Sequence, residues 1–445
     1  MAIDNKDKKV LKSSIEREQN EVACSAECEK IKGSKNLNVP HLRFPEFSEE
    51  WEICKVSELL DFYSTNSLSW EQLEYGTKAI MNLHYGLIHV GLPTMVDLTR
   101  DNLPNIKEDN MPKNFELCKE GDVAFADASE DTNEVAKPIE FFDLAGKNIV
   151  CGLHTIHGRD NKNKTVIGFK GYAFSSSAFH NQIRRIAQGT KIYSISTKNF
   201  SECFIGIPSK VEQTKIATLL RLIDERIATQ NKIIEKLQSL IKGLNDNIHK
   251  GIKGETVCFS DLGEAYSGLS GKGGDDFGYG EPFITYMNVY QNTYISEKDY
   301  ELVQIAPNEK QNSVQYGDAL FTLSSETPEE VGIGAVYLGN TQKLYLNSFC
   351  FGIHFYDERV LPQYLAHFIS SSSFRRAIYP LAQGSTRFNL QKNDFMKMKF
   401  LLPSLEKQGH IANTLDALHC RLANEKSLTE QYILLKKYLL SLMFI

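Results

Sequence analysis

An acidic stretch from Asp127 to Glu134 is the place where residue types and spacing come closest to those of a metal-dependent nuclease. Carboxylate oxygens are the ligands that Mg²⁺ prefers, so a tight acidic group can hold a catalytic metal. A later stretch, LSSETPEE from Leu323, keeps two of the acids but has Leu323 where the first stretch has Asp127, which weakens the nuclease interpretation. The acids concerned are Asp127, Glu130, Asp131 and Glu134 in the first stretch, with Glu326 and Glu330 retained in the second.

Motifs for nucleotide, methyltransferase or hydrolase chemistry fail on their spacing. The loop GLSGKGG resembles a phosphate-binding loop, but only two residues follow Gly268 before the next glycine, and Gly273 stands where Ser or Thr belongs. VGIG, from Val331, lacks the third glycine of a dinucleotide fingerprint. Pro-Pro, Gly-x-Ser-x-Gly and His-Glu-x-x-His do not occur, so an Asn-Pro-Pro-Tyr amino-methyltransferase motif is excluded. The sequence therefore predicts a binding protein that is not an enzyme and binds no cofactor itself.

The cysteines and histidines do not predict a metal site. Of nine cysteines, only Cys24 and Cys28 lie close together, and neither a second pair nor a histidine accompanies them. Structural zinc sites use four ligands in tight pairs, so free thiols in a reducing compartment are the interpretation. His154 and His157 follow Cys151 in a predicted strand, and we interpret them as packing or surface residues.

Length and composition are typical of a folded protein with two or three domains. The chain has 445 residues, of which 42% are hydrophobic, and that length exceeds what one ordinary core accommodates. No window approaches 18 uncharged apolar residues, and residues 1–38 are charged and lack the apolar core of a signal peptide. We therefore expect a cytoplasmic protein whose first 38 residues are a disordered extension.

Basic residues form two islands although the formal net charge is −6. Four basic residues and no acid lie between Arg184 and Lys198, and six lie between Arg375 and Lys399 against Asp394 alone. Nucleic-acid binding depends on the local field more than on the net charge, so both islands are candidate binding surfaces. Each island contains the phrase Ala-Gln-Gly-(Thr/Ser).

The shared phrase is part of an internal repeat. A shift of 195 residues superposes Ala187 on Ala382 and FSSSAF on ISSSSF just upstream. A shift of 196 superposes GDVAFADASEDTNEV, from Gly121, on GDALFTLSSETPEEV, from Gly317. Agreement over more than a hundred residues indicates one module followed by a divergent copy of itself.

Each module has a head rich in short apolar and aromatic runs, followed by a long helix. The head sequences are broken by glycine turns and predict a β-rich structure with minor helix. After Pro208, Ser209 and Glu212 have the spacing of a capping box, and apolar residues recur every three or four positions with Gln230 as the one polar interruption. Gly251 supplies the stop.

A second helix is predicted after Pro403, where Gln408 aligns with Gln213 of the first. Its seam repeats the spacing at Ile411, Leu415, Leu418 and Leu422 and is less regular beyond Glu425. Two matching apolar stripes in one chain predict that the helices pack on each other. The fold class is therefore α+β: two β-rich domains related by tandem duplication, joined by two long helices.

From Val39 onward the chain resembles the DNA-specificity subunit of type I restriction–modification systems. The resemblance is carried by VPHLRFPEFSEEWEICKVSEL at Val39–Leu59, the two boxes with Gly-Asp, Ser-Glu and Glu-Val, the two Ala-Gln-Gly turns and the two helix openings with Pro-Ser, Gln and Ile-Ala. It implies two target-recognition domains that each read one half of a bipartite DNA site. It also implies that the two helices form an antiparallel coiled coil that sets the spacing of the two halves.

The same resemblance implies partners and domain boundaries. Double-stranded DNA, two methyltransferase subunits and the restriction subunits are the expected partners, and S-adenosylmethionine, ATP and Mg²⁺ would belong to those subunits. The expected parts are the extension 1–38, the first target-recognition domain 39–207, the central helix 208–250, the second target-recognition domain 251–402 and the C-terminal helix 403–445.

Two sets of residues are candidates for DNA contact. The basic turns offer phosphate ligands, because glycine lets a backbone approach closely and hydroxyls and cations flank it; a plain C-capping glycine is the alternative. Polar and aromatic residues in the variable parts of the heads are candidates for base readout, with ordinary strand residues as the alternative. The turn candidates are Arg184, Arg185, Gln188, Gly189, Thr190 and Lys191, and Arg375, Arg376, Gln383, Gly384, Ser385, Thr386 and Arg387; the readout candidates are Asn82, His84, Tyr85, Tyr286, Asn288 and Tyr290.

A repeated Ser-Glu dipeptide is predicted to have a structural role. Ser129-Glu130 and Ser325-Glu326 recur in both copies, so we expect them to support shared architecture instead of distinct readout. A duplicated scaffold that binds protein or glycan instead of DNA is the alternative function. Neighbouring genes for a methyltransferase and a helicase–nuclease would favour the DNA reader, and their absence would favour the scaffold.

Overall fold

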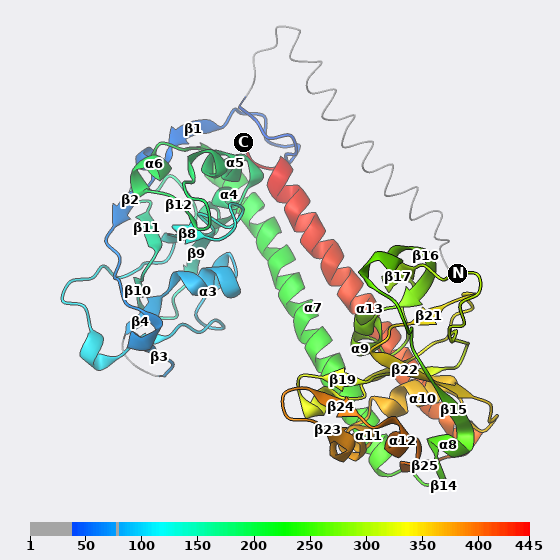
Figure 1. The fold of residues 1–445 in the computed structure, drawn as a ribbon. Helices are drawn as coiled ribbons and strands as arrows, with labels where there is room; N and C mark the ends of the chain where they lie inside the picture. The colour runs from blue at the N-terminus through cyan, green and yellow to red at the C-terminus, as the bar shows by residue number, and fades with distance from the viewer. Residues whose placement is uncertain (1–37, 77–79) are drawn as a thin grey trace, which may run out of the picture. The chain divides into compact units, whose positions relative to one another are not determined.

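The computed structural model describes residues 38–76 and 80–445 and divides the chain into two compact units (Figure 1). Unit 1 comprises the described residues up to Ile227 together with Gln431–Ile445, and unit 2 comprises Ala228–Glu430. Residues 1–37 of the predicted extension lie outside the described residues. Within the described ranges, no helix combines the length and the apolar character that a membrane span requires.

A five-stranded and a four-stranded sheet form the centre of unit 1. The larger sheet has the order β2-β11-β7-β9-β5, in which β5 is parallel to β9 and the other neighbours are antiparallel. The smaller has the order β10-β4-β6-β3, with β10 parallel to β4. The strands are β2 (Asp61–Tyr63), β3 (Leu73–Glu74), β4 (Ile80–Leu83), β5 (Met95–Asp97), β6 (Asn105–Ile106), β7 (Val123–Ala126), β9 (Pro138–Asp143), β10 (Asn148–Cys151) and β11 (Thr155–Arg159).

Short helices and two small antiparallel sheets complete unit 1. One small sheet pairs β1 with β13 and the other pairs β12 with β8. These elements are β1 (Glu52–Lys55), α2 (Val56–Leu59), η1 (Trp70–Gln72), α3 (Tyr85–Val90), η2 (Glu108–Asn110), β8 (Ala128–Ser129), α4 (Lys170–Phe174), α5 (Ser177–Ile186), β12 (Tyr193–Ser194), α6 (Thr197–Ser201) and β13 (Phe204–Ile207).

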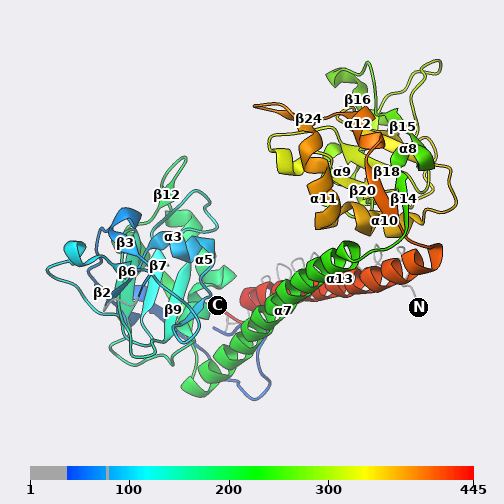
Figure 2. The same cartoon turned by 90° about the horizontal axis from the view of Figure 1, so that it is seen from below.

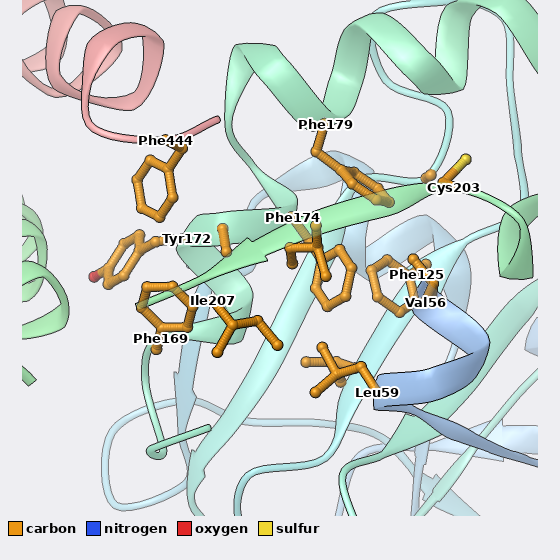
Figure 3. Packing of buried hydrophobic residues seen from close by; sticks show 14 of the residues in the cluster. Val56, Leu59, Phe125, Phe169, Tyr172, Phe174, Phe179, Cys203, Ile207 and Phe444 are labelled. Carbon is orange, nitrogen blue, oxygen red and sulfur yellow. The ribbon is translucent and has the colours of Figure 1, made fainter. Parts of the chain in front are cut away.

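Strand β7 lies between two apolar layers of unit 1. Val123 and Phe125 belong to the larger core cluster, and the alternate residues Ala124 and Ala126 belong to a second cluster on the opposite face. Figure 3 shows the larger cluster, in which the ring of Phe125 packs against neighbouring phenylalanines; its centroid lies 4.9 Å from that of Phe174. Burying a side chain of this size contributes about 1.5–3 kcal/mol, so this layer is the main source of the stability of unit 1.

Unit 2 contains four sheets with a comparable layout. Their orders are β14-β25, β15-β22-β18-β20, β17-β16-β21 and β19-β24-β23. As in β7, alternate residues of β18 belong to different core clusters. The strands are β14 (Glu255–Cys258), β15 (Gly263–Ser267), β16 (Phe277–Ile284), β17 (Tyr300–Val303), β18 (Ala319–Thr322), β19 (Ser324–Ser325), β20 (Gly334–Val336), β21 (Tyr345–Leu346), β22 (Cys350–Phe355), β23 (Ala382–Gln383), β24 (Phe388–Leu390) and β25 (Lys399–Leu402).

The short helices of unit 2 connect these sheets and cover their core. Tyr364 and Phe368 of α10 are buried against the same cluster that contains Phe321 of β18. The helices are α8 (Phe259–Leu262), η3 (Gly274–Asp276), α9 (Tyr286–Gln291), η4 (Glu297–Asp299), η5 (Pro328–Glu330), α10 (Pro362–Ile369), α11 (Ser372–Ile378), η6 (Tyr379–Leu381) and α12 (Lys392–Met396).

Two long helices confirm the predicted helical segments: α7 (Lys210–Lys250, 41 residues) and α13 (Leu405–Leu442, 38 residues) (Figure 1). Within unit 1, Lys436 of α13 forms an ion pair with Asp224 of α7 at 2.6 Å. Within unit 2, Gln230 of α7 donates a hydrogen bond to the carboxylate of Glu425. Within unit 1, the guanidinium carbon of Arg226 also lies 5.8 Å from the ring centroid of Tyr432, so numbering rises along α7 while it falls along α13 in that unit.

The start of α7 is attached to its head by one buried glutamine. The Gln213 side chain is 0% exposed, and its carbonyl oxygen accepts a hydrogen bond from the backbone N–H of Val166 at 2.9 Å. Its amide nitrogen donates to the carbonyl oxygens of Lys164 and Pro208 at 3.1 and 2.8 Å. One side chain thus satisfies three backbone groups of unit 1.

Gln408 makes the equivalent set of bonds at the start of α13. It is also 0% exposed, accepts from the backbone N–H of Leu361 at 2.8 Å, and donates to the carbonyl oxygens of Arg359 and Pro403 at 2.7 and 2.8 Å. The residues aligned by the 195-residue shift therefore perform the same structural task in both units.

The predicted capping box at α7 is half formed. The backbone N–H of Glu212 donates to the Ser209 hydroxyl at 3.4 Å, as the motif requires. The carboxylate of Glu212, however, is 1% exposed and accepts two hydrogen bonds from Arg43 at 2.7 and 2.8 Å. A bidentate guanidinium is a stronger partner than a backbone amide, so the interpretation of Glu212 as a reciprocal cap was wrong.

Replacing the buried glutamine should destabilise the unit that contains it. The substitution Gln213→Ala leaves the Val166 N–H without its acceptor, and an unsatisfied buried donor costs about 1–3 kcal/mol. We expect the free energy of unfolding, measured by urea denaturation, to fall by that amount. The matched control is Gln238→Ala on the exposed face of α7, for which a change within about 0.5 kcal/mol is expected. Equal losses in both variants would contradict the role of Gln213.

Candidate nucleic-acid interface

The first basic turn forms a hairpin at the surface of unit 1. Helix α5 ends at Ile186, and Gln188 and Ser194 then exchange backbone hydrogen bonds of 2.9 and 2.8 Å. Strand β12 of this hairpin pairs with β8, placing Tyr193 opposite Ser129. The residues from Gln188 to Lys191 are exposed at the tip. We call residues 188–194 the first basic hairpin; Figure 2 shows it projecting from unit 1 at β12.

The second basic turn forms a matching hairpin in unit 2. Strands β23 and β24 pair through Gln383 and Asn389, and β24 pairs with β19, placing Phe388 opposite Ser325. All residues from Gln383 to Arg387 are exposed. We call residues 382–390 the second basic hairpin (Figure 2). Ser129 and Ser325 thus confirm the expectation that this repeated dipeptide supports shared architecture.

The glycine of each hairpin is required by the turn and is not a helix cap. Gly189 has a φ of +139°, and a Cβ there would lie 1.9 Å from the carbonyl oxygen of Ile192. Gly384 has a φ of +147°, and a Cβ there would lie 2.0 Å from the carbonyl oxygen of Arg387. Any other residue would clash with the opposite side of the loop, since L side chains rarely adopt this conformation. The close approach that glycine permits is therefore within the hairpin itself.

The predicted cations of unit 1 surround the first hairpin. Arg185 and Lys191 are exposed. Arg184 is exposed as well, and its guanidinium donates to the Asn133 side chain at 2.6 Å. His180, one turn earlier on α5, binds the carbonyl oxygen of Thr132 at 3.2 Å. Helix α5 is thus attached to the acidic stretch 127–134, and its cations face solvent beside the hairpin.

In unit 2, one of the predicted cations has a structural role. Arg375 donates to the carbonyl oxygens of Gly332, Glu329 and Val331 at 2.6–2.7 Å, and burial lowers its pKa. Arg375 is the counterpart of His180 under the 195-residue shift, and both hold carbonyls of the adjoining acidic stretch. Arg376 and Arg387 remain exposed. These two, and not Arg375, offer an accessible charge beside the second hairpin.

The readout candidates of unit 1 lie where β4 runs into α3. Asn82 is 0% exposed, and its side-chain oxygen accepts from Asn66 at 2.6 Å. His84 is 3% exposed, caps α3 by accepting from Gly86 N–H at 3.1 Å, and has a pKa lowered chiefly by burial. Only Tyr85 is half-buried. Asn82 and His84 therefore position the start of α3 beneath the surface.

The candidates of unit 2 lie on α9. Asn288 is 2% exposed and binds both backbone groups of Ser296, at 2.8 and 3.0 Å. Tyr286 and Tyr290 are half-buried with stacked rings 6.0 Å apart, and their hydroxyls donate to the Ser324 carbonyl at 2.9 Å and to the Glu330 carboxylate at 2.7 Å. Asn288 thus supports the loop that follows α9, while Tyr286 attaches α9 to β19 and Tyr290 attaches it to η5.

A corresponding attachment exists in unit 1. His89 of α3 binds the carbonyl oxygen of Ala128 at 2.9 Å and lies 3.8 Å from the Glu134 carboxylate. Ala128 and Glu134 occupy the positions of Ser324 and Glu330 under the 196-residue shift. His89 therefore takes over both contacts that two tyrosines make in unit 2. Sequence reasoning missed His89 because its partner is 39 residues away and no pattern connects them.

The acidic stretch that suggested a nuclease is engaged with its own chain. His154 lies 3.1 Å from the Asp127 carboxylate, whose pKa is raised by burial. Lys137 forms an ion pair with Glu134 at 2.7 Å, and Asp131 accepts from the backbone N–H of Asn133 at 2.8 Å. These contacts give the carboxylates roles in shaping the turn beneath the first hairpin.

Each head also contains a buried carboxylate that the sequence did not single out. Asp122 is 1% exposed and binds His157 and Arg159 at 2.8–2.9 Å; burial alone would raise its pKa, but these two partners hold it below the usual range. Asp318 is 2% exposed and binds His354 at 2.8 Å and the Tyr266 hydroxyl at 2.7 Å. Each Asp follows the glycine of the repeated Gly-Asp pair, and this repetition is the sequence signal that could have identified the two carboxylates.

Three side chains that can bind metal come together beside Asp122. Cys118, Cys151 and His157 each offer a ligand atom, these atoms lie within 4.8 Å of one another, and all three residues are buried. Their wide separation along the chain explains why spacing did not predict the group.

An exposed aromatic residue, Phe349, also escaped the sequence-based search. It is 54% exposed, and the guanidinium carbon of Arg387 lies 5.7 Å from its ring centroid. A cation over an exposed aromatic face is suited to stacking and phosphate contact together. The surface around each hairpin thus combines hydroxyls, cations and aromatic rings, which are groups that bind a nucleic-acid backbone.

The chain is similar in sequence to known specificity proteins of type I restriction systems. A sequence model of the family described as "Type I restriction modification DNA specificity domain" matches residues 254–431. The type I restriction enzyme EcoKI specificity subunit of Escherichia coli K12 is 25% identical over 279 residues, which are 56% of this chain and 58% of that protein. The putative type I restriction enzyme MjaX specificity subunit of Methanocaldococcus jannaschii is 22% identical over 432 residues, 92% of this chain and 96% of the relative. The matched segment thus spans little more than half of the EcoKI subunit.

Solved structures show the same fold. A crystal structure of the S subunit of a type I restriction–modification system from M. genitalium covers 92% of this chain and 99% of its own, with a TM-score of 0.52 and 15% identity. A structure from work on complex assembly and conformational transition of the type I system covers 90% and 98%, with a TM-score of 0.57 and 14% identity. Together with the sequence matches, these likenesses make the chain similar, in segments of its sequence and in its fold, to specificity subunits of type I restriction–modification systems.

Proposed function

We propose that this chain is the DNA-specificity subunit of a type I restriction–modification complex, in which each head reads one half of a bipartite DNA site. The observation that carries the proposal is the pair of basic hairpins. Each unit presents an exposed Ala-Gln-Gly loop with cations and hydroxyls, built on the same small sheet. Two similar nucleic-acid-binding surfaces in one chain suit a recognition site that is itself in two parts.

Tandem duplication is the proposed origin of the two heads. The support is structural equivalence at aligned positions: Gln213 and Gln408 make the same three hydrogen bonds, and Asp122 and Asp318 each bind a histidine. The proposed parts are a first target-recognition domain at 39–207, a central helix at 208–250, a second target-recognition domain at 251–402 and a C-terminal helix at 403–445.

The two long helices are proposed to form an antiparallel coiled coil that sets the distance between half-sites. The Asp224–Lys436 pair within unit 1 and the Gln230–Glu425 pair within unit 2 support opposite directions for the facing stretches. A helix of about 40 residues is about 60 Å long at 1.5 Å per residue, which is a suitable length for a spacer.

The exposed residues of the hairpins and the exposed cations of the preceding helices α5 and α11 are the proposed phosphate contacts, and residues of α3 and α9 contribute to base readout. Arg184, Arg185, Gln188, Gly189, Thr190 and Lys191 serve in the first head, and Arg376, Gln383, Gly384, Ser385, Thr386 and Arg387 in the second. Tyr85, Tyr286 and Tyr290 are the accessible readout candidates. The buried Asn82, His84 and Asn288, together with Arg375, are assigned positioning roles behind them.

Catalysis is proposed to reside in partner subunits, and this chain is proposed to be non-catalytic. Two methyltransferase subunits and the restriction subunits would bind S-adenosylmethionine, ATP and Mg²⁺ and act in the cytoplasm on the DNA that this chain selects. The name of the structural relative from work on complex assembly supports an assembled enzyme, and the family supports DNA recognition as this chain's share.

Removing a hairpin cation should weaken DNA binding for every sequence. Lys191→Ala and Arg387→Ala each remove one phosphate ligand, so affinity should fall uniformly and the slope of log K against log salt should decrease by about 1. Fluorescence anisotropy at several salt concentrations, with specific and unrelated duplexes, measures both quantities. Lys210→Ala and Lys407→Ala, at exposed positions in the first turns of α7 and α13, are the matched controls. Unchanged affinity and slope in the hairpin variants would contradict the phosphate role.

Lengthening both long helices should change the spacer and leave the half-site letters unchanged. One additional heptad in each helix keeps the apolar seam in phase and adds about 10 Å, which corresponds to about three base pairs at 3.4 Å each. Methylation mapping in cells that express the variant with its partner subunits gives the recognised site. A site with altered half-site letters and an unchanged spacer would overturn the proposed spacing role of the helices.

A further inference from the structure

Unit 1 contains a buried group of two thiols and one imidazole that its DNA-binding role does not use. The Sγ atoms of Cys118 and Cys151 lie 3.5 Å apart, and a ring nitrogen of His157 lies within 4.8 Å of both. The three residues are 5%, 1% and 0% exposed. In a tetrahedral zinc site with bonds of about 2.3 Å, two sulfur ligands lie about 3.8 Å apart, so the observed spacing suits a shared ion.

The imidazole is oriented as metal-binding histidines are. Nε2 of His157 lies 2.8 Å from the Asp122 carboxylate, and Nδ1 is buried and has no hydrogen-bond partner among the described residues. Ligating histidines commonly donate their second N–H to a carboxylate, which fixes the ring and raises its basicity. Asp122 is in turn held by Arg159 at 2.8 Å.

Unit 2 has a comparable backbone around this place but neither the two sulfur atoms nor the imidazole. The backbone N–H of Cys118 donates to Ile149 at 2.8 Å, and Cys151 follows two residues later; the backbone N–H of Val314 donates to Leu344 at 2.7 Å, and Leu346 follows two residues later. Val314 and Leu346 are buried together in an apolar cluster. In the strand register, Gly352 takes the place of His157, and Tyr266 and His354 bind Asp318 where His157 and Arg159 bind Asp122.

This comparison indicates that the fold does not require the two thiols. Apolar residues fill the same places in unit 2, so packing alone would accept Val and Leu in unit 1. Thiolate and imidazole ligands select Zn²⁺ among the common divalent ions, whereas Mg²⁺ and Ca²⁺ prefer oxygen. Two thiolates neutralise one Zn²⁺ and the imidazole stays neutral, so the assembled site can be buried without an uncompensated charge.

We propose that Cys118, Cys151 and His157 bind one Zn²⁺ ion in the first head, with Asp122 holding the imidazole. Three protein ligands leave the fourth position of the ion to water. Cys151 lies on β10 of the four-stranded sheet and His157 on β11 of the five-stranded sheet. The ion would therefore join the two sheets of unit 1 and stabilise the sheet that carries Asn82 and His84 at the start of α3.

The full chain, purified under reducing conditions without chelator, tests the proposal. Elemental analysis should find about one zinc per chain, and Co²⁺ added to chelator-treated protein should produce thiolate-to-metal charge-transfer absorption. Cys118→Val and Cys151→Leu, which copy the residues of unit 2, should abolish both signals. The matched control is Cys203→Ala, which removes another buried thiol of unit 1 and should leave both unchanged. Asp122→Asn should lower metal affinity about 10–100-fold.

A second measurement keeps the test valid if a variant is poorly folded. Circular dichroism verifies folding of each variant, and a strong chelator should lower the melting temperature of the wild-type chain and of Cys203→Ala but not that of folded Cys118→Val. Absence of zinc and of the cobalt band from the reduced wild-type chain would overturn the proposal. So would equal zinc in the wild type and in the Cys118 variant, or a mass loss of two hydrogens showing a Cys118–Cys151 disulfide. None of these readouts involves DNA.

Discussion

Each head is fixed to its long helix by one buried glutamine, and the placement of the binding surface depends on this contact. Gln213 and Gln408 each satisfy one N–H and two carbonyl groups of the backbone where the head ends and the helix begins. A side-chain amide can accept one hydrogen bond and donate two at once, so neither an ionised Glu nor an apolar residue can replace it without leaving a buried backbone group unpaired. These hydrogen bonds therefore join the start of each long helix to its own head.

The two heads share a set of core elements but differ in the side chains that attach their helices to it. The frame comprises the core strand β7 or β18, the buried Asp of the Gly-Asp pair and the small sheet that supports the basic hairpin. The attaching side chains differ in chemistry. His89 occupies the place of two tyrosines, and Arg375 occupies that of His180. A frame held by backbone pairing and buried polar bonds tolerates such exchanges, because neither depends on the solvent-facing side chains. This separation suits the proposed function, in which the two heads read different sequences.

The sequence predicts the features that depend on neighbouring residues better than those that depend on contacts between distant residues. The long helices have boundaries within three residues of those expected, because a 3–4 apolar period, a preceding proline and, for α7, a terminal glycine are local signals. Glu212 was misassigned because its partner Arg43 is 169 residues away. The sequence does not predict the burial of Asn82 and Asn288, because polarity alone does not reveal whether an amide binds another side chain, as Asn82 does, or backbone, as Asn288 does. The Cys118–Cys151–His157 group depends on the pairing of two sheets, which no spacing rule encodes.

The contact between Gln230 and Glu425 disfavours pairing between two first halves or two second halves of such chains. The two residues occupy corresponding positions under the 195-residue shift, and both are almost fully buried. Two first halves meeting through this stretch would bring one neutral amide against another. Two second halves would bring two carboxylates together in an apolar seam, where like charges cannot both remain ionised. An acid facing an amide thus favours pairing of a first half with a second half. This one contact therefore selects the correct partner helix as well as the register of the two helices.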